Sequence, residues 1–327
     1  MTTIHAKHAL IDSELKNDVF ISVENGIITG VDNSGKADQQ IENILLPGFI
    51  DIHCHGGGRF YFSDENPAHI REIIAIHRKF GTTSINASLV TAPIDQIKEQ
   101  IKRLKPFVKS GEILGIHLEG PFLSKDKCGA HDPELLIDPK ISILEELLAI
   151  AEGSISMVTL APELPSGIEA IKCLVSNGVK VAIGHSNASY EIGKEALAAG
   201  ASIYTHFWNA TPTFDLNKPT NTLATAALED PKMLLEFIND GVHLNDEIFN
   251  FLLDKYSSRL ISISDAMSAA GAGDGCLRRV LHRQRAGEQA GAVRRPRAGG
   301  RHAVRAVPGG PHHRVGHGPV PVVREAW

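Results

Sequence analysis

The segment Gly115-Ile-His-Leu-Glu-Gly-Pro-Phe122 decides how the rest of the chain is interpreted. Small and apolar residues lead into His117, Glu119 follows two positions later, and Gly120-Pro121 ends any strand. Because side chains alternate faces along a strand, His117 and Glu119 point to the same side at its carboxyl end. In parallel α/β proteins that end binds ligands. Glu119 is therefore either a ligand-binding carboxylate or a solvated turn residue.

The composition is typical of a soluble enzyme. The chain has 327 residues, 43% of them hydrophobic and 22% charged, and this length suffices for one large core or two smaller ones. The sequence contains no apolar run long enough to span a membrane and no export signal. We therefore predict a cytoplasmic protein without a membrane partner. Four scattered cysteines fit reduced thiols: Cys54, Cys128, Cys173 and Cys276.

The charge differs between two parts of the chain. Residues 1–275 hold 17 Lys and 5 Arg against 36 Asp and Glu, a net charge of −14. Residues 276–327 hold 11 Arg and no Lys against 2 Glu, a net charge of +9. The acidic body argues against a nucleic-acid partner, whereas the tail taken alone favours one.

The basic tail also lacks any structural period. Residues 276–327 contain 8 Gly and 5 Pro, a density typical of unstructured sequence. Arg replaces Lys while Ala, Gly, Pro and His increase, as when G+C-rich DNA is translated in a wrong frame. We interpret the tail as a frameshift product, and a genuine basic, disordered extension is the alternative.

Eight short apolar runs alternate with helical segments in residues 46–275. The runs are Phe49–His53, Thr83–Val90, Ile113–Leu118, Ile155–Leu160, Val179–Ile183, Ser202–His206, Leu234–Ile238 and Leu260–Ser264. The helical segments include Pro67–Phe80, Ile94–Val108, Ile141–Ala151 and Asn245–Tyr256. Near-continuous apolar runs fit strands that are covered on both faces. The pattern predicts an α/β protein with a (β/α)8 TIM barrel.

Residues 1–45 have the pattern of short strands instead. Asp18–Val23 and Ile27–Val31 flank Asn25-Gly26, the strongest short signal for a β-hairpin. We expect these residues to form part of a small β domain.

Polar residues that bind metals follow several of the predicted barrel strands. They are His53, His55, Glu119, His185, His206 and Asp265, and Asp240-Gly-Val-His243 follows the seventh run. His53 and His55 are two positions apart, so both face the barrel mouth while Cys54 faces away. Any one His could be structural or solvated, but a series at the ends of different strands predicts a metal site. Imidazole and carboxylate ligands suit Zn²⁺ or Fe²⁺ rather than Mg²⁺.

With these motifs the chain resembles the amidohydrolase superfamily and, within it, the N-acetylglucosamine-6-phosphate deacetylases. The motifs are Leu46-Pro-Gly-Phe-Ile-Asp-Ile-His-Cys-His-Gly56, His117-Leu-Glu-Gly-Pro-Phe122, Gly129-Ala-His-Asp-Pro133, Ala161-Pro-Glu163, Gly184-His-Ser-Asn-Ala188, Thr205-His-Phe-Trp-Asn-Ala210, Asp240-Gly-Val-His243 and Ser264-Asp-Ala-Met267. The resemblance covers residues 1–275. It implies a barrel with a small β-sandwich built from both chain ends, incomplete here because the tail does not match. It also implies a homodimer that removes acetate from an amino-sugar phosphate.

The resemblance also implies roles for single residues. Glu119, His185 and His206 would hold the principal divalent metal, and Asp265 would transfer protons. His53 and His55 resemble the pair that binds a second metal in binuclear members, so one or two metals per subunit remain open.

Other positions resemble substrate contacts. His131 would contact the substrate beside the amide, and His243 with the Asn209-Ala210 backbone would contact the sugar phosphate. The loop after residue 210 lacks the Arg that binds phosphate in the family and offers only Lys218. Lys can hold a phosphate, but without the bidentate fork of Arg.

Two other interpretations remain open at this point. The chain could be a related amidohydrolase that acts on a cyclic amide or an N-acyl amino acid. It could also be a truncated, inactive barrel that binds metal or sugar phosphate weakly. Cys128 is expected to be a free surface thiol, with a redox-sensitive residue of a lid as the alternative.

Overall fold

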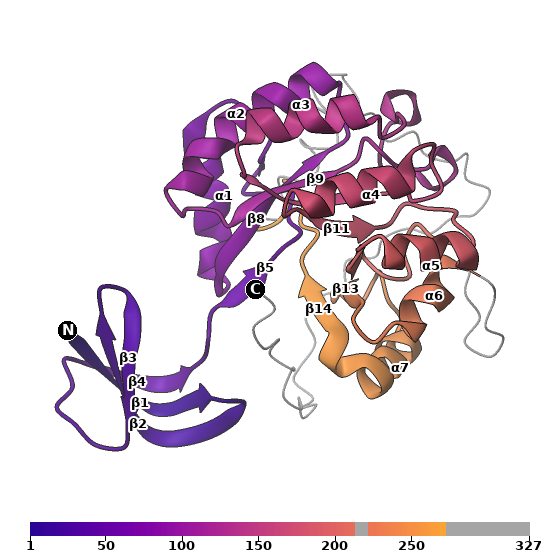
Figure 1. The fold of residues 1–327 in the computed structure, drawn as a ribbon. Helices are drawn as coiled ribbons and strands as arrows, with labels where there is room; N and C mark the ends of the chain where they lie inside the picture. The colour runs from indigo at the N-terminus through magenta and orange to yellow at the C-terminus, as the bar shows by residue number, and fades with distance from the viewer. Residues whose placement is uncertain (213–221, 273–327) are drawn as a thin grey trace. The chain divides into compact units, whose positions relative to one another are not determined.

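The computed structural model describes residues 1–212 and 222–272 (Figure 1). These residues form two compact units, which divide between Phe49 and Ile50, four residues after the boundary predicted at residue 45. The predicted boundary after residue 275, the tail, Lys218 and Cys276 lie outside the described residues.

The first unit is a four-stranded sheet in the order β3-β2-β1-β4. Its strands are β1 (Thr2–Ile11), β2 (Glu14–Glu24), β3 (Ile27–Asp32) and β4 (Gln39–Leu45). The predicted Asn-Gly hairpin is confirmed, because β2 pairs antiparallel with β3 and both turn residues, Asn25 and Gly26, have positive φ. A small apolar cluster supports this sheet, with Ala6, Ala9, Val19 and Ile21 buried.

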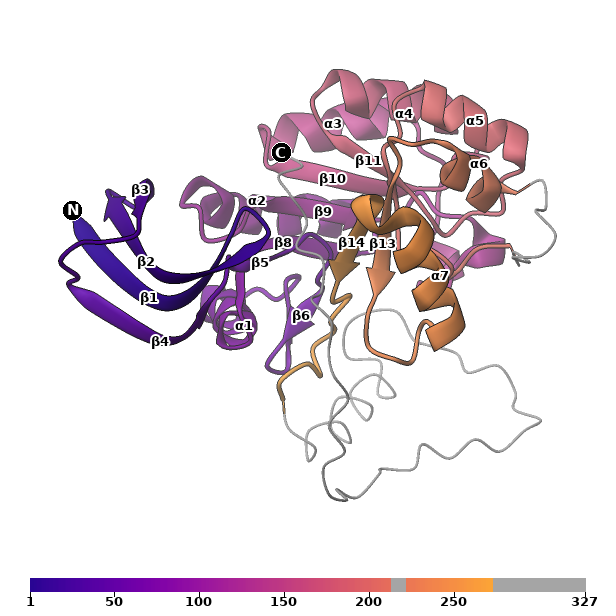
Figure 2. The same cartoon turned by 90° about the horizontal axis from the view of Figure 1, so that it is seen from below.

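The second unit is built on eight strands in the order β14-β13-β12-β11-β10-β9-β8-β5. They are β5 (Phe49–Asp51), β8 (Thr82–Val90), β9 (Gly115–Glu119), β10 (Ile155–Leu160), β11 (Lys180–Ile183), β12 (Ile203–Tyr204), β13 (Leu234–Ile238) and β14 (Leu260–Ile263). Neighbours from β8 to β14 pair in parallel, and Figure 2 shows β13 beside β14. A short hairpin of β6 (Gly56–Gly57) and β7 (Phe60–Tyr61) follows β5. All eight predicted strands are present, and the predicted (β/α)8 barrel is confirmed.

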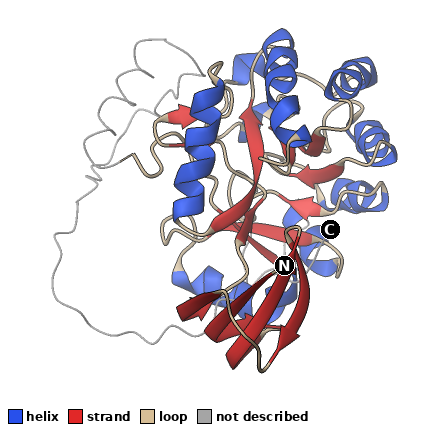
Figure 3. Ribbon diagram, turned by 90° about the vertical axis from the view of Figure 1, so that its left-hand side faces the viewer, coloured by secondary structure: helices blue, strands red, loops and turns tan. Residues whose placement is uncertain are grey.

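Helices surround the strands of this barrel (Figure 3). They are α1 (Pro67–Lys79), α2 (Ile94–Lys109), α3 (Ile141–Ala151), α4 (Gly167–Ser176), α5 (Tyr190–Ala198), α6 (Leu223–Glu229) and α7 (Asp246–Tyr256), with short 3-10 turns η1 (Lys125–Lys127), η2 (Pro133–Leu135) and η3 (Ser257–Arg259). The four predicted helices are α1, α2, α3 and α7. Within the part of the chain that the structure describes, no helix is both long and apolar enough to cross a bilayer.

The barrel interior is apolar at its floor and polar above it. Met157, Ala182 and Ile203 belong to a buried apolar cluster inside the strands. Two positions after Met157 and Ile203 stand Thr159, in β10, and Thr205, directly after β12, and both are fully buried. Because strand side chains alternate, this places a polar layer between the apolar floor and the carboxyl ends of the strands.

Asp51 closes the barrel between its first and last strands. Its Oδ2 accepts a hydrogen bond of 2.5 Å from the Ser264 hydroxyl, and its Oδ1 accepts from the backbone N–H groups of His53 and Ser264. Beside it the Asp265 N–H donates to the His53 carbonyl at 2.9 Å. These bonds join β5 to β14 and fix the chain at His53 and Asp265.

Replacing Asp51 by Ala is therefore expected to destabilise the fold. Three donors would lose a buried acceptor, and we expect the free energy of unfolding to fall by about 2–4 kcal/mol. Asp51→Asn keeps one acceptor oxygen and should lose less. Denaturant titration of the three proteins checks this, and equal midpoints would show that other contacts close the barrel.

Candidate metal centre and active site

Five buried imidazoles converge on the carboxylate of Glu119. Their Nε2 atoms lie between 3.1 and 3.6 Å from its oxygens, and they belong to His53, His55, His131, His185 and His206. Glu119 is the last residue of β9 and is 3% exposed. With Asp265, which lies 3.3 Å from His55, the structure brings together seven of the predicted site residues, and Glu119 lies at their centre.

These residues form two adjoining groups. In one group, Asp265 Oδ1 lies 3.5 Å from His53 Nε2 and 3.3 Å from His55 Nε2. In the other, His185 and His206 each place Nε2 within 3.2 Å of Glu119 Oε1. Glu119 joins the groups because its second oxygen contacts His55 at 3.1 Å. Either group offers three protein ligands of the kind that Zn²⁺ and Fe²⁺ accept.

The hydrogen bonds behind the imidazoles show which nitrogen carries the hydrogen. Nδ1 of His55 faces the Ser88 carbonyl at 3.2 Å, and Nδ1 of His185 faces the Lys127 carbonyl at 2.8 Å. A carbonyl oxygen only accepts, so Nδ1 is the donor in both rings. In the neutral rings Nε2 is then a bare lone pair directed into the cluster.

The facing nitrogens fit a divalent cation. His185 and His206 place their Nε2 atoms 3.0 Å apart, and His53 and His55 place theirs 3.1 Å apart. Lone pairs that face each other at this distance repel, and a cation between them turns the repulsion into coordination. The donor set therefore fits the divalent metal that the sequence predicts.

His131 is arranged differently from the other four imidazoles. Its Nδ1 accepts from the Thr91 backbone N–H at 3.4 Å and lies 2.7 Å from the Thr91 hydroxyl. Because Nδ1 accepts, the hydrogen of the neutral ring is on Nε2, which lies 3.4 Å from Glu119. His131 could approach a metal with Glu119 and His185, but its hydrogen-bond polarity makes it a donor towards the site.

The buried carboxylates favour positive charge at His53 and His55. Burial alone would raise the pKa of Glu119, but His53 and the hydrogen bond from His131 hold it well below its usual value. Burial alone would lower the pKa of His55, but its hydrogen bonds with Asp265 and Glu119 raise it to about 9. The two carboxylates thus provide the field that a divalent cation needs.

Strained backbone places three of the site residues. His185, His206 and Asp265 have φ values of 47°, 26° and 43°, which non-glycine residues rarely adopt. Each of the three stands two residues after the end of a barrel strand. Such strain is characteristic of functional sites, where the surrounding fold holds it. At Gly129, beside His185, a Cβ would lie 2.9 Å from the ring, so only glycine fits.

His117 lies on the Glu119 side of β9, as predicted, but in the layer below the centre. Its Nδ1 lies 2.9 Å from the Ser88 hydroxyl, and its Nε2 lies 2.8 Å from the Thr159 hydroxyl. The Thr159 hydroxyl in turn lies 2.9 Å from the Thr205 hydroxyl. Burial and the neighbouring His53 hold its pKa well below the usual value. His117 is therefore a neutral residue of the polar layer.

The predicted substrate residues are less closely connected to the cluster. The Asn209 N–H donates to the His206 carbonyl, so Asn209 and Ala210 directly follow a cluster residue. His243 is about half exposed and bonds to Asp240 at 2.8 Å. Across residues 1–212 and 222–272, no hydrogen bond or ion pair joins His243 to the five imidazoles.

A third group of possible ligands lies behind β5. Cys54 faces away from the barrel mouth, as predicted, and its Sγ is 3.2 Å from His77 Nε2 of α1, with Asp51 nearby. Both Asp51 oxygens already accept the bonds that close the barrel. Burial raises the pKa of the Cys54 thiol well above its usual value, so the thiol is unreactive. We interpret this group as structural.

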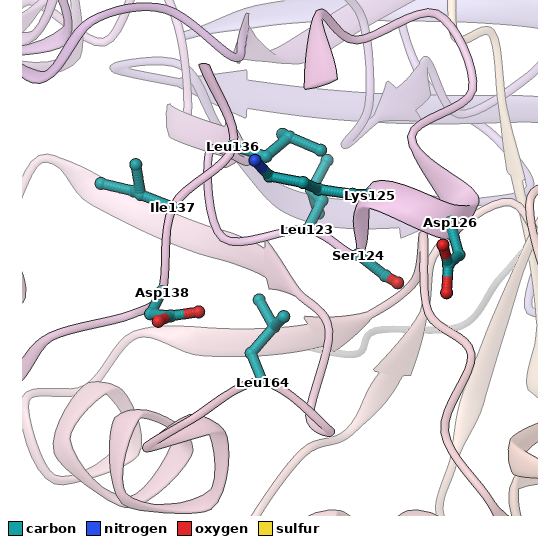
Figure 4. Close-up of a pocket in the computed structure, with 8 residues that line it drawn as sticks. All are labelled: Leu123, Ser124, Lys125, Asp126, Leu136, Ile137, Asp138 and Leu164. Carbon is teal, nitrogen blue, oxygen red and sulfur yellow. The ribbon is translucent and has the colours of Figure 1, made fainter. Parts of the chain in front are cut away.

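A cavity of about 220 Å³ lies near the loops that follow β9 and β10 (Figure 4). It is lined by Leu123, Ser124, Lys125, Asp126, Leu136, Ile137, Asp138 and Leu164. None of the converging imidazoles lines it, so we assign the chemistry to the cluster and not to this cavity. The half-buried free thiol of Cys128 follows the 3-10 turn η1.

Sequence reasoning missed the residues that orient the imidazoles. Glu236 contacts His53, and Ser88 and Thr91 contact His55 and His131. The available signal was Glu236 itself, a charged residue inside the apolar run Leu234–Ile238. Ser88 acts through its backbone carbonyl, which no sequence pattern reveals.

Solved structures of known proteins resemble this fold over most of the chain. A solved N-acetyl-D-glucosamine-6-phosphate deacetylase from Mycobacterium smegmatis is 37% identical, with a TM-score of 0.77 over 84% of this chain and 74% of that one. A mutant from the same organism, in complex with N-acetyl-D-glucosamine-6-phosphate, is 36% identical with a TM-score of 0.78 over 84% and 72%.

Sequence relatives agree with the structural neighbours. An N-acetylgalactosamine-6-phosphate deacetylase of Escherichia coli O157:H7 is 30% identical over 83% of this chain and 73% of its own length. An N-acetylglucosamine-6-phosphate deacetylase of Lysinibacillus sphaericus is 35% identical over 69% of this chain, which spans 59% of that relative. The model of the amidohydrolase family matches residues 44–277. With a barrel of this kind and histidines converging at its mouth, the chain belongs to the amidohydrolase family.

Proposed function

We propose that this chain hydrolyses the acetamide of N-acetylglucosamine 6-phosphate to glucosamine 6-phosphate and acetate, a step of amino-sugar catabolism. The observation that carries the proposal is the cluster of five imidazoles and two carboxylates at the strand ends of the barrel. Relatives and solved structures with this name, 35–37% identical to the chain, support the substrate.

Glu119, His185 and His206 are our proposed ligands of the principal metal, and His53 and His55 those of a second. The imidazoles suit Zn²⁺ or Fe²⁺. A divalent cation bound there would lower the pKa of water and polarise the acetyl carbonyl.

Asp265 is the proposed proton-transferring residue. Burial alone would raise the pKa of its carboxyl, but the imidazoles of His53 and His55 lower it, so the carboxylate is ionised at neutral pH. It accepts a proton from water as the water oxygen bonds to the acetyl carbon. The carboxyl then gives this proton to the nitrogen as the C–N bond breaks, because an unprotonated amide nitrogen is a poor leaving group.

His131 is the proposed donor to the carbonyl oxygen. Its Nε2–H points into the cluster, since Nδ1 accepts from Thr91. As the carbonyl carbon becomes tetrahedral, negative charge develops on its oxygen, and a fixed donor stabilises that charge more than the neutral carbonyl.

The sugar phosphate is assigned to the residues beyond the cluster. We propose that His243 and the Asn209-Ala210 backbone contact it, together with Lys218. We also propose that the protein is a cytoplasmic homodimer. Light scattering during gel filtration measures the oligomeric state, and a monomer would contradict the proposed homodimer.

Acetate release tests the proposed function directly. The purified chain, loaded with Zn²⁺ or Fe²⁺, is incubated with N-acetylglucosamine 6-phosphate, its galactosamine epimer, a cyclic amide and an N-acetyl amino acid. Release of acetate from the first substrate at the highest kcat/KM supports the proposal. Preference for the cyclic amide or the amino acid would assign the chain to another amidohydrolase activity. Metal binding without any turnover would match a truncated, inactive barrel.

The phosphate group is expected to decide substrate preference. A charge-assisted contact contributes about 1.5–3 kcal/mol, which corresponds to roughly 10- to 150-fold in kcat/KM over unphosphorylated N-acetylglucosamine. His243→Ala should reduce this ratio without changing turnover of the unphosphorylated sugar. Equal kcat/KM for the two sugars in the unmodified chain would remove the phosphate contact.

A further inference from the structure

Glu236 is a fully buried carboxylate that the proposed reaction does not use. It lies in the middle of β13 with 0% exposure, inside the apolar run Leu234–Ile238. Removing a carboxylate from water is costly unless hydrogen bonds replace the lost hydration. No Lys or Arg forms an ion pair with Glu236 in the part of the chain described, so its partners must explain why it is there.

Both partners of Glu236 belong to the metal centre. Its Oε2 accepts from Nδ1–H of the His53 ring at 3.1 Å and from the backbone N–H of His206 at 3.3 Å. Its Oε1 has no hydrogen-bond partner among the residues that the structure describes. One oxygen of Glu236 thus contacts a member of each ligand group, His53 and His206. Glu236 itself lies on β13, which contributes none of the five imidazoles.

The contact with His53 determines what that ring offers to the centre. A carboxylate accepts and cannot donate, so the hydrogen of the neutral His53 ring is on Nδ1 and its Nε2 is a free lone pair. That Nε2 faces His55, Glu119 and Asp265 within 3.6 Å. A carboxylate behind an imidazole also makes the ring a stronger electron donor to a metal.

The contact with His206 is made by its backbone N–H and so restrains the main chain at that residue. His206 has a φ of 26°, outside the regions that non-glycine residues favour, and its N–H points at Glu236. Strained conformations persist only where neighbouring groups hold them. The bond to Glu236 is one such restraint, and it fixes the start of the segment that carries the His206 ring.

We propose that Glu236 is a positioning residue that sets the affinity of the centre for divalent metal through His53 and His206. The inference rests on the proposed metal dependence of the chain and does not depend on which amide is hydrolysed. Glu236 would thus be a third carboxylate of the centre, which lies behind the imidazoles, whereas Glu119 and Asp265 face them.

Metal titration without sugar tests this role. The dissociation constant for Zn²⁺, from competition with a chromophoric chelator, is compared for the unmodified chain, Glu236→Ala and Glu236→Gln. Residues behind metal ligands typically change affinity by about 10- to 100-fold, and we expect such a loss for Glu236→Ala. Glu236→Gln keeps an oxygen for both N–H groups but lacks the charge, so its loss should be smaller. Glu195→Gln, on the exposed face of α5, is the matched control.

Nitrogen NMR of the Zn²⁺-loaded protein labelled at histidine reports which nitrogen of His53 carries the hydrogen. With Zn²⁺ bound at Nε2, we expect the hydrogen of the His53 ring on Nδ1 in the unmodified chain and a weaker or broadened Nδ1–H signal in Glu236→Ala, which a merely structural role would not produce. Unchanged Zn²⁺ affinity in both Glu236 variants would overturn the proposal, even if they melt earlier. If Glu236→Ala fails to fold, unchanged affinity in Glu236→Gln overturns it. A chain that binds Zn²⁺ as expected but releases no acetate refutes the proposed deacetylation and leaves this inference standing.

Discussion

Replacing Glu119 by Gln is expected to remove bound metal and hydrolysis together. Five imidazole Nε2 atoms lie within 3.6 Å of the two Glu119 oxygens, and this carboxylate joins both ligand groups. The amide of Gln keeps the shape but loses the charge, and it turns one acceptor into a donor that faces the lone pairs. We expect hydrolysis to fall by at least about 10²-fold, beyond the typical loss for a residue behind the ligands.

Elemental analysis of the purified variants measures the metal directly. His185→Ala and His206→Ala should behave like Glu119→Gln, because each removes one of the three proposed principal ligands. His117→Gln is the control and should keep its metal. His117 is as buried as Glu119 but contacts Thr159 in the polar layer below the cluster. Full metal content in all three ligand variants would refute the assignment of the principal site.

Replacing Asp265 by Asn is expected to separate metal binding from turnover. Asp265 lies 3.3 and 3.5 Å from His55 and His53 and is not one of the three principal ligands. An amide cannot accept the proton of water, so kcat should fall by about 10²- to 10⁴-fold, the usual contribution of general acid–base catalysis. Much of the metal should remain bound.

The test of Asp265 compares kcat with metal content in the same preparation. Asp265→Glu keeps the carboxylate but moves it, and should retain more activity than Asp265→Asn. Near-normal turnover of Asp265→Asn would mean that another group accepts the proton. Loss of metal in proportion to activity would instead make Asp265 a ligand of the centre.

The strands could be predicted because their pattern is local. Each barrel strand is a short apolar run next to turn residues, and a fully covered parallel sheet produces this pattern. Two runs are shorter as strands than predicted: Phe49–His53 forms only Phe49–Asp51, and Ser202–His206 forms only Ile203–Tyr204 as β12. His206 turns out of the strand with positive φ, a conformation set by contacts from distant parts of the chain.

The cluster could be predicted in outline for a different reason. The carboxyl ends of parallel strands meet at one end of a barrel, so His53, Glu119 and Asp265 had to lie close together. What supports them could not be predicted in the same way. Glu236 is 183 residues from His53 in sequence, and only the closed barrel brings it to the Nδ1 atom. The polarity of His131 likewise depends on a backbone N–H of Thr91.

The closure of the barrel through Asp51 also has a consequence for biosynthesis. His53 and Asp265, which this seam joins, are far apart in the chain. A ribosome adds about 5–20 residues per second, so the nascent chain exposes His53 and His55 for roughly 10–40 s before Asp265 is made. During that interval the early histidines are free to capture stray ions. The complete set of ligands exists only after β14 has docked on β5, so we expect stable metal loading to follow that step.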